Sequence, residues 1–60
     1  MMEQLPQDPI MLYSVLNTKL RDFYPSLDAL CQDLNVDQKE IMEKLAGVGF
    51  SYDEEKNQFI

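Results

Sequence analysis

Apolar residues recur at helical spacing in the middle of the chain and predict two short helices joined by a tight turn. The first begins at Ser26, whose hydroxyl can accept from the free amides of the first turn. Its apolar stripe falls at i, i+3, i+4 and i+7 and consists of Leu27, Leu30, Cys31 and Leu34. Asn35 follows where a left-handed residue is needed to leave the helix, and Asn tolerates that conformation well.

The second helix of the pair has a strong start signal. Asp37 can cap it, and Glu40 stands three residues later, so the two can form a reciprocal capping box. Val36 before the cap and Ile41 after it form a hydrophobic staple, which fixes the angle at which the chain enters the helix.

The apolar stripe of this second helix consists of Ile41, Leu45 and Val48. We therefore expect a helix over residues 38–48 that ends at Gly49, because an end at Gly47 would take Val48 off the stripe. Small Cys31 lies where the two helices would cross most closely. The pattern is typical of a helix-turn-helix, and a plain helical hairpin is the alternative.

An earlier helix is predicted over residues 9–23. Asp8 supplies a capping carboxylate and Pro9 suits the first helical position, whereas the residue before Pro25 avoids helical geometry. The expected core face, with Tyr13 at its edge, consists of Leu12, Val15, Leu16, Leu20 and Phe23.

Three side chains of this helix fit the pattern less well. Lys19 falls inside the apolar arc, so either its stem covers the core or it meets a carboxylate across a helix interface. Ile10 and Met11 lie toward the polar side. They either pack against Leu5 or belong to a partner surface.

The end of the chain predicts a short hairpin, with strands at 50–53 and 57–60. Phe50 and Tyr52 alternate with a polar residue, and Asn57 can take a left-handed turn position. Phe59, with Phe50 or Tyr52, would pack under the first or third helix. The expected fold is mainly α: a three-helix, helix-turn-helix-like domain with a short C-terminal β-hairpin, and so winged-helix-like.

Sixty residues make one domain, which we place at 8–60 after a flexible N-terminal segment at 1–7. No apolar run is long enough to span a membrane, and the N-terminus lacks the pattern of a signal peptide. The single cysteine, Cys31, cannot form an internal disulfide, which suits a reducing cytoplasm. Because it lies on an apolar stripe among acids, we expect a buried, inert core residue.

Residues that carry chemistry are scarce. The chain has no His, so the usual nucleophile–base pairs are missing and a metal site is not expected. Asp53, Glu54 and Glu55 suggest a solvated turn more than a cation site, and Gly47 and Gly49 lack the context of a phosphate loop. We expect neither an enzyme nor a cofactor.

Several separate segments resemble a known family. They are LPQDP at 5–9, NTKLRDFY at 17–24, SLDALC at 26–31 and YDEEKNQF at 52–59. In this order they resemble a family of short bacterial proteins from gut anaerobes that carries a domain-of-unknown-function label. The resemblance covers nearly the whole chain and implies a bacterial, cytoplasmic protein. It implies no activity, ligand or catalytic residue.

Two functions compete on these residues. The first is protein–protein interaction or self-association through the exposed face of the 38–48 helix, whose candidate residues are Gln38, Lys39, Met42, Glu43 and Ala46. Exposed Met and a small core suit a homodimer or a partner protein.

The alternative is a nucleic-acid-binding, transcription-regulator-like domain that uses the same helix, with Gln38 and Lys39 near its start. A local basic patch could involve Lys19 and Arg21. The net charge of −6 and the acids at the front of the helix oppose phosphate contacts, so we favour protein interaction.

Overall fold

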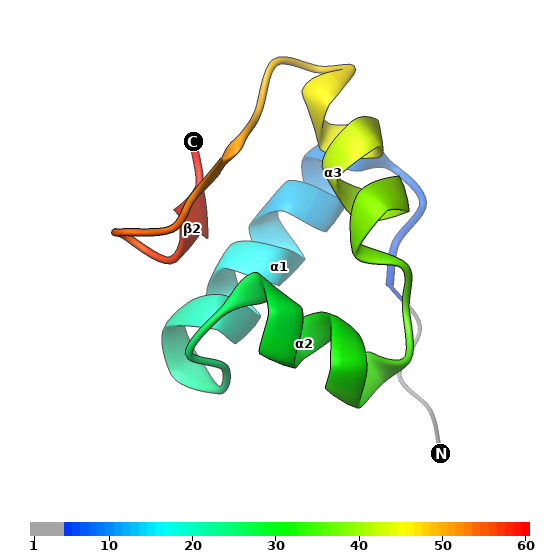
Figure 1. The fold of residues 1–60 in the computed structure, drawn as a ribbon. Helices are drawn as coiled ribbons and strands as arrows, with labels where there is room; N and C mark the ends of the chain where they lie inside the picture. The colour runs from blue at the N-terminus through cyan, green and yellow to red at the C-terminus, as the bar shows by residue number, and fades with distance from the viewer. Residues whose placement is uncertain (1–4) are drawn as a thin grey trace.

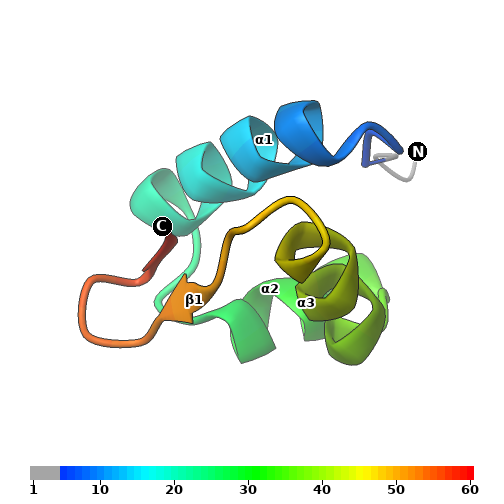
Figure 2. The same cartoon turned by 90° about the horizontal axis from the view of Figure 1, so that it is seen from above.

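Across residues 5–60, the part of the chain that it describes, the computed structural model contains three helices and one two-stranded antiparallel hairpin. The elements are α1 (Pro9–Asp22), α2 (Leu27–Leu34), α3 (Gln38–Ala46), β1 (Tyr52–Asp53) and β2 (Gln58–Phe59). Helix α1 contacts α2, α3 and β2. Figure 2 shows α1 along one side of the molecule, with α2, α3 and β1 on the other. The predicted three-helix domain with a short C-terminal hairpin is confirmed (Figure 1).

Within residues 5–60, the buried side chains are all apolar and form one cluster. They are Leu12, Leu16 and Leu20 from α1, Leu27, Leu30 and Cys31 from α2, Ile41 and Leu45 from α3, and Phe59 from β2. Because Phe59 is only 1% exposed, the hairpin closes a core that the helices build. Leu5 packs against this cluster, whereas residues 1–4 of the predicted flexible segment 1–7 lie outside the described residues.

Helix α1 begins as predicted. The carboxylate of Asp8 accepts from the amide of Met11 at 3.0 Å, and Pro9 occupies the first helical turn without losing a bond. Ile10 and the side chain of Met11 are exposed, so the first turn of α1 presents apolar surface to solvent.

The predicted core face of α1 is wrong at two positions. Phe23, at the C-terminal cap, is 72% exposed, and Val15 is only half-buried. The covered face is turned instead toward Tyr13 and Asn17, because the hairpin packs on that side of the helix. The ring of Tyr13 stacks on that of Phe50, with centroids 3.9 Å apart.

The turn between α2 and α3 has the predicted left-handed residue. Ser26 caps α2, and Asn35 leaves it with φ 58° and ψ 49°. The amide of Val36 donates to the carbonyl of Cys31 at 3.0 Å, and the amide of Asn35 donates to that of Gln32 at 3.4 Å. This pair of bonds is the Schellman motif, which satisfies carbonyls at the end of a helix.

Helix α3 is capped by Asp37, but not through the predicted box. The carboxylate of Asp37 accepts from the amide of Lys39 at 2.9 Å rather than from that of Glu40. Either amide satisfies the first turn, so the cap is kept with a different partner. The expected staple residues, Val36 and Ile41, both pack at the core.

The end of α3 repeats the Schellman motif at a glycine. The amide of Phe50 donates to the carbonyl of Leu45 at 3.0 Å, and the left-handed residue is Gly49, with φ 92°. The predicted end of the helix at Gly49 is nevertheless wrong, because α3 stops at Ala46 with Gly47 as its C-terminal cap, and Gly49 lies in the turn that follows. Val48 is 41% exposed and not part of the buried stripe, because it lies in the departing turn and Phe50 covers the core instead.

The hairpin is shorter than predicted, with two residues in each strand. Its turn is shaped by side chains: Asp53 Oδ1 accepts from the amides of Glu55 and Lys56 at 2.9 and 3.2 Å, and Asn57 is left-handed with φ 54°. The carboxylate of Asp53 therefore stabilises the turn by accepting these two hydrogen bonds.

Candidate functional site: a groove between α3 and the hairpin

A groove of about 600 Å³ lies between α3 and the segment that enters β1. Its lining residues are Gln38, Lys39, Met42, Glu43, Ala46, Phe50, Ser51, Tyr52 and Phe59. The first five come from α3 and are the five residues predicted from the sequence as an interaction surface. The structure therefore brings them together on one side of the groove and adds a second side that is mostly aromatic.

The aromatic side of the groove is held firmly. Phe50 stacks on Tyr13 of α1, and the rings of Tyr52 and Phe59 lie 5.5 Å apart at 55°. Phe59 is buried, and Phe50 and Tyr52 are half-buried, so each offers one part to the groove and another to the core. On the α3 side Met42 is 41% exposed. Apolar surface thus faces the groove from both sides.

Asn17 fastens β2 to α1. Its Nδ2 donates to the carbonyl of Phe59 at 3.1 Å, and its Oδ1 accepts from the amide of Phe59 at 2.7 Å. One side-chain amide therefore satisfies both the amide and the carbonyl of Phe59 in β2, as a neighbouring strand would. This pair sets the distance between the hairpin and α1, and with it the position of the groove wall.

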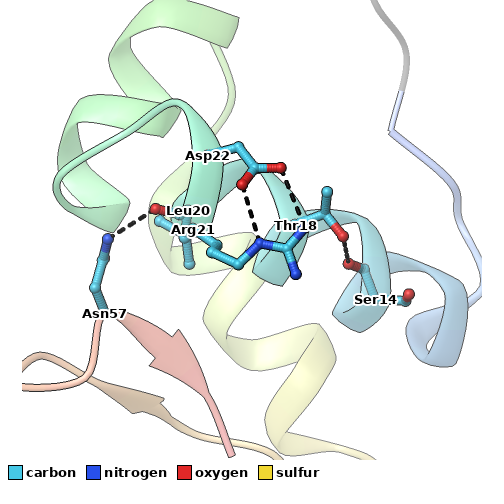
Figure 3. Close-up of polar contacts among 6 residues, drawn as sticks. All are labelled: Ser14, Thr18, Leu20, Arg21, Asp22 and Asn57. Carbon is cyan, nitrogen blue, oxygen red and sulfur yellow. Dashed lines mark hydrogen bonds and ion pairs between the residues drawn. The ribbon is translucent and has the colours of Figure 1, made fainter.

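Asn57 makes a second set of hydrogen bonds between the hairpin and the end of α1. Its Nδ2 donates at 3.1 Å to the carbonyl of Leu20, in the last turn of α1 (Figure 3). The same Nδ2 donates at 2.9 Å to the carbonyl of Tyr24, which follows the helix. Its Oδ1 accepts from the hydroxyl of Tyr52 at 2.6 Å, and that hydroxyl accepts from the amide of Leu27 at 3.1 Å. The chain of bonds joins β1, the end of α1 and the start of α2.

Around the start of α3 the groove continues into a smaller hollow of about 300 Å³. The two share Gln38, Met42 and Tyr52. Asp28 and Glu54 line the hollow and Glu43 lines the groove, whereas Lys39 is the one cationic residue among the lining residues. The charged groups at the edge of this apolar surface are therefore mainly negative.

Lys19 and Arg21, the predicted basic patch, stand two positions apart on α1 and so face different sides of the helix. Lys19 is half-buried. Arg21 donates to its neighbour Asp22, with Nε–Oδ1 at 3.0 Å and Nη2–Oδ2 at 3.2 Å (Figure 3). This hydrogen bond and the charge of Arg21 lower the pKa of Asp22. Arg21 lines a polar hollow with Lys56, and neither of these residues lines the groove.

Cys31 is 5% exposed, in the core as predicted. Burial raises the pKa of its thiol, and the carboxylates of Asp28 and Asp37 add to the same effect. Within residues 5–60, no three side chains of the metal-binding types gather closely enough to hold an ion. Over the same residues, no helix combines the length and apolar character needed to cross a membrane.

Sequence reasoning missed the residues that hold the groove wall in place. Nothing in the apolar pattern of α1 sets Asn17 apart from the other polar residues of the helix. Asn57 was recognised only for its backbone conformation, and Tyr52 only for packing. The one usable signal is that Asn17 lies four residues after Tyr13, so the two share a face of the helix.

Comparison with known proteins gives one result, a match to a protein family. No curated protein and no solved structure is similar enough to this chain to count as a match. Residues 6–59 match the family described as Domain of unknown function (DUF4250), and this match spans nearly the whole chain. The chain therefore belongs to the DUF4250 family.

Proposed function

We propose that this chain is a small protein-interaction module that binds its partner in the groove between α3 and the hairpin. The observation that supports it is the groove itself: Met42 and Ala46 face Phe50, Tyr52 and Phe59 across a hollow of about 600 Å³. Grooves with an apolar interior and a few polar groups at the edge are the usual form of peptide- and ligand-binding sites.

The charge of the molecule favours a protein partner over nucleic acid. Binding to duplex DNA rests largely on phosphate contacts from Lys and Arg, and this chain has a net charge of −6. On α3 the exposed Lys39 is accompanied by the exposed Glu40 and Glu43. From its cap at Asp37 to Glu43, the helix that would enter the DNA groove therefore carries three carboxylates and one ammonium group.

A matched pair of variants tests the proposal. Met42 and Val48 are both 41% exposed, but only Met42 lines the groove. A displayed library of random twelve-residue peptides would be selected on the immobilised wild-type chain. Affinities of the selected peptides would then be measured by fluorescence anisotropy for wild type, Met42→Lys and Val48→Lys.

We expect the peptides to bind wild type and Val48→Lys alike and to bind Met42→Lys at least about tenfold more weakly, the loss of a well-placed apolar contact. Circular dichroism would confirm that both variants fold. Selection of no peptide, or equal binding to both variants, would overturn the proposal. Micromolar binding of mixed-sequence duplex DNA with a steep dependence on salt would establish the nucleic-acid alternative instead.

A further inference from the structure

The partner's form can be inferred from the hairpin, and this inference rests on the proposed function. We infer that the groove takes an extended, basic peptide segment, which adds as a third strand to the free edge of β1. The other possible occupants, a helix or a second copy of this chain, are outcomes of the experiment below.

The register of the hairpin fixes which backbone groups point outward. The amide of Ser51 donates to the carbonyl of Ile60 at 2.9 Å, and the amide of Ile60 donates back at 2.9 Å. In an antiparallel ladder such reciprocal pairs alternate with pairs that exchange no bonds. The next pair, Tyr52 and Phe59, is of the second kind, so the amide and carbonyl of each point away from the other strand.

The two outward edges meet different surroundings. On the β2 edge, Asn17 accepts from and donates to the backbone of Phe59. On the β1 edge, the amide and carbonyl of Tyr52 point toward the side where α3 lies, since Figures 1 and 2 place β1 between β2 and α3. Phe50, Ser51 and Tyr52 line the groove there. A peptide strand would form hydrogen bonds with the amide and carbonyl of Tyr52 on this edge, as Asn17 does with those of Phe59 on the other.

An extended peptide also suits the walls of the groove. Side chains of a strand alternate between its two faces, so every second side chain of an added strand would meet Met42, Ala46 or Phe50. A helix brings its own backbone bonds and would leave the edge of β1 unused.

The charges select a basic segment. Asp28, Glu43 and Glu54 border the groove and its continuation, against the single cation Lys39. Lys or Arg residues on the outer face of the added strand would lie near these carboxylates. The net charge of −6 would also draw a basic peptide toward the chain and disfavour a second copy of the same acidic chain.

A backbone N-methyl scan of the selected peptides tests the strand. Each peptide would be made with one N-methyl group at each position in turn, which removes one amide donor at a time. Because one residue of an antiparallel strand would pair with Tyr52, we expect a loss of roughly three- to tenfold at one position and little change at its two neighbours. Losses at several consecutive positions would indicate a helix and overturn the inference.

Charge is tested on the protein. Glu54 borders the hollow, and its neighbour Glu55 is exposed and lines neither the hollow nor the groove. We expect Glu54→Gln to weaken binding roughly two- to fivefold at low salt and Glu55→Gln to leave it unchanged. Selected peptides without basic residues, or equal effects of the two variants, would overturn the charge argument.

The two proposals fail differently. If binding depends on Met42 but the N-methyl scan shows no single sensitive position, the groove stands and the strand does not. If sedimentation shows that the chain dimerises and that Met42→Lys abolishes the dimer, the occupant is a second copy and the peptide inference is wrong. If no binding of any kind depends on Met42, the proposed function itself fails.

Discussion

We expect Asn17→Ala to lower the free energy of unfolding by about 1–2 kcal/mol, a large share of the stability of so small a domain. The variant removes two hydrogen bonds, at 3.1 and 2.7 Å, and leaves the amide and carbonyl of Phe59 without their partner beside a buried ring. Two such bonds contribute about 2 kcal/mol net, and Ala returns up to about 0.7 kcal/mol in helix propensity. The melting temperature should fall by roughly 5–15 °C.

The matched control is the next residue along α1. Thr18 Oγ1 donates to the carbonyl of Ser14 at 3.1 Å within the same helix, and the side chain is exposed (Figure 3). Thr18→Ala should therefore change the free energy of unfolding by less than about 0.5 kcal/mol. Thermal melts followed by circular dichroism would compare the two. If Asn17→Ala melts within a degree or two of Thr18→Ala, Asn17 does not hold the hairpin as argued.

Three further predictions concern the other asparagines and the thiol. Asn57→Gly keeps the left-handed turn but loses three hydrogen bonds, so urea unfolding should show a free energy of unfolding lower by about 1–3 kcal/mol. Asn57→Ala should lower it by roughly 1 kcal/mol more, because Ala is strained at positive φ. An unchanged stability of Asn57→Gly would contradict this role. Cys31 should react with Ellman's reagent far more slowly in the native chain than in denaturant, because the side chain is buried. Its raised pKa also makes the reactive thiolate scarce near neutral pH. Equal rates in the two conditions would refute its burial. Asn35→Gly should have a melting temperature near that of wild type, because Gly adopts φ 58° without strain. Asn35→Val should lower the free energy of unfolding by about 1–3 kcal/mol, because a β-branched residue is strained there. Equal melting temperatures of the two variants would mean that the turn relaxes.

The starts and ends of the helices could be predicted because they depend on a few adjacent residues. Asp8, Ser26, Asn35 and Asp37 all serve in the structure as terminal residues of the kind expected, whereas the end of α3 falls at Gly47 and not at Gly49. Caps act within one turn, so the sequence around them carries the information. The partner of a cap is less certain, as the bond to Asp37 shows, because two amides lie within its reach.

The covered face of α1 could not be predicted in the same way. The helix alone presents an apolar arc from Leu12 to Phe23, and periodicity cannot tell which edge of that arc another element will cover. The hairpin comes from residues about forty positions later and packs on the edge marked by Tyr13 and Asn17. That choice depends on contacts distant in sequence, so Phe23 was expected in the core and is exposed.

The candidate surface was predictable on one side only. The exposed face of α3 follows from helical periodicity, and its five predicted residues all line the groove. The aromatic wall opposite them, formed by Phe50, Tyr52 and Phe59, depends on where the hairpin packs, and the sequence pattern does not determine that position. A flat helix face and a groove differ in how much of a partner they can cover, so the hairpin changes the kind of partner that fits.

The residues that position the hairpin are separate from those that would meet a partner. Asn17 and Asn57 hold the wall but do not line the groove, whereas Met42 and Ala46 line it and make no part of the buried core. A wall fixed by hydrogen bonds to α1 keeps the groove open before binding, and a preformed site loses less conformational freedom when it is filled. The edge of β1 is held in the same way, since the hydroxyl of Tyr52 is fixed by Asn57 and by the amide of Leu27. The long-range hydrogen bonds of Asn17 and Asn57 therefore hold the apolar lining of the groove in position.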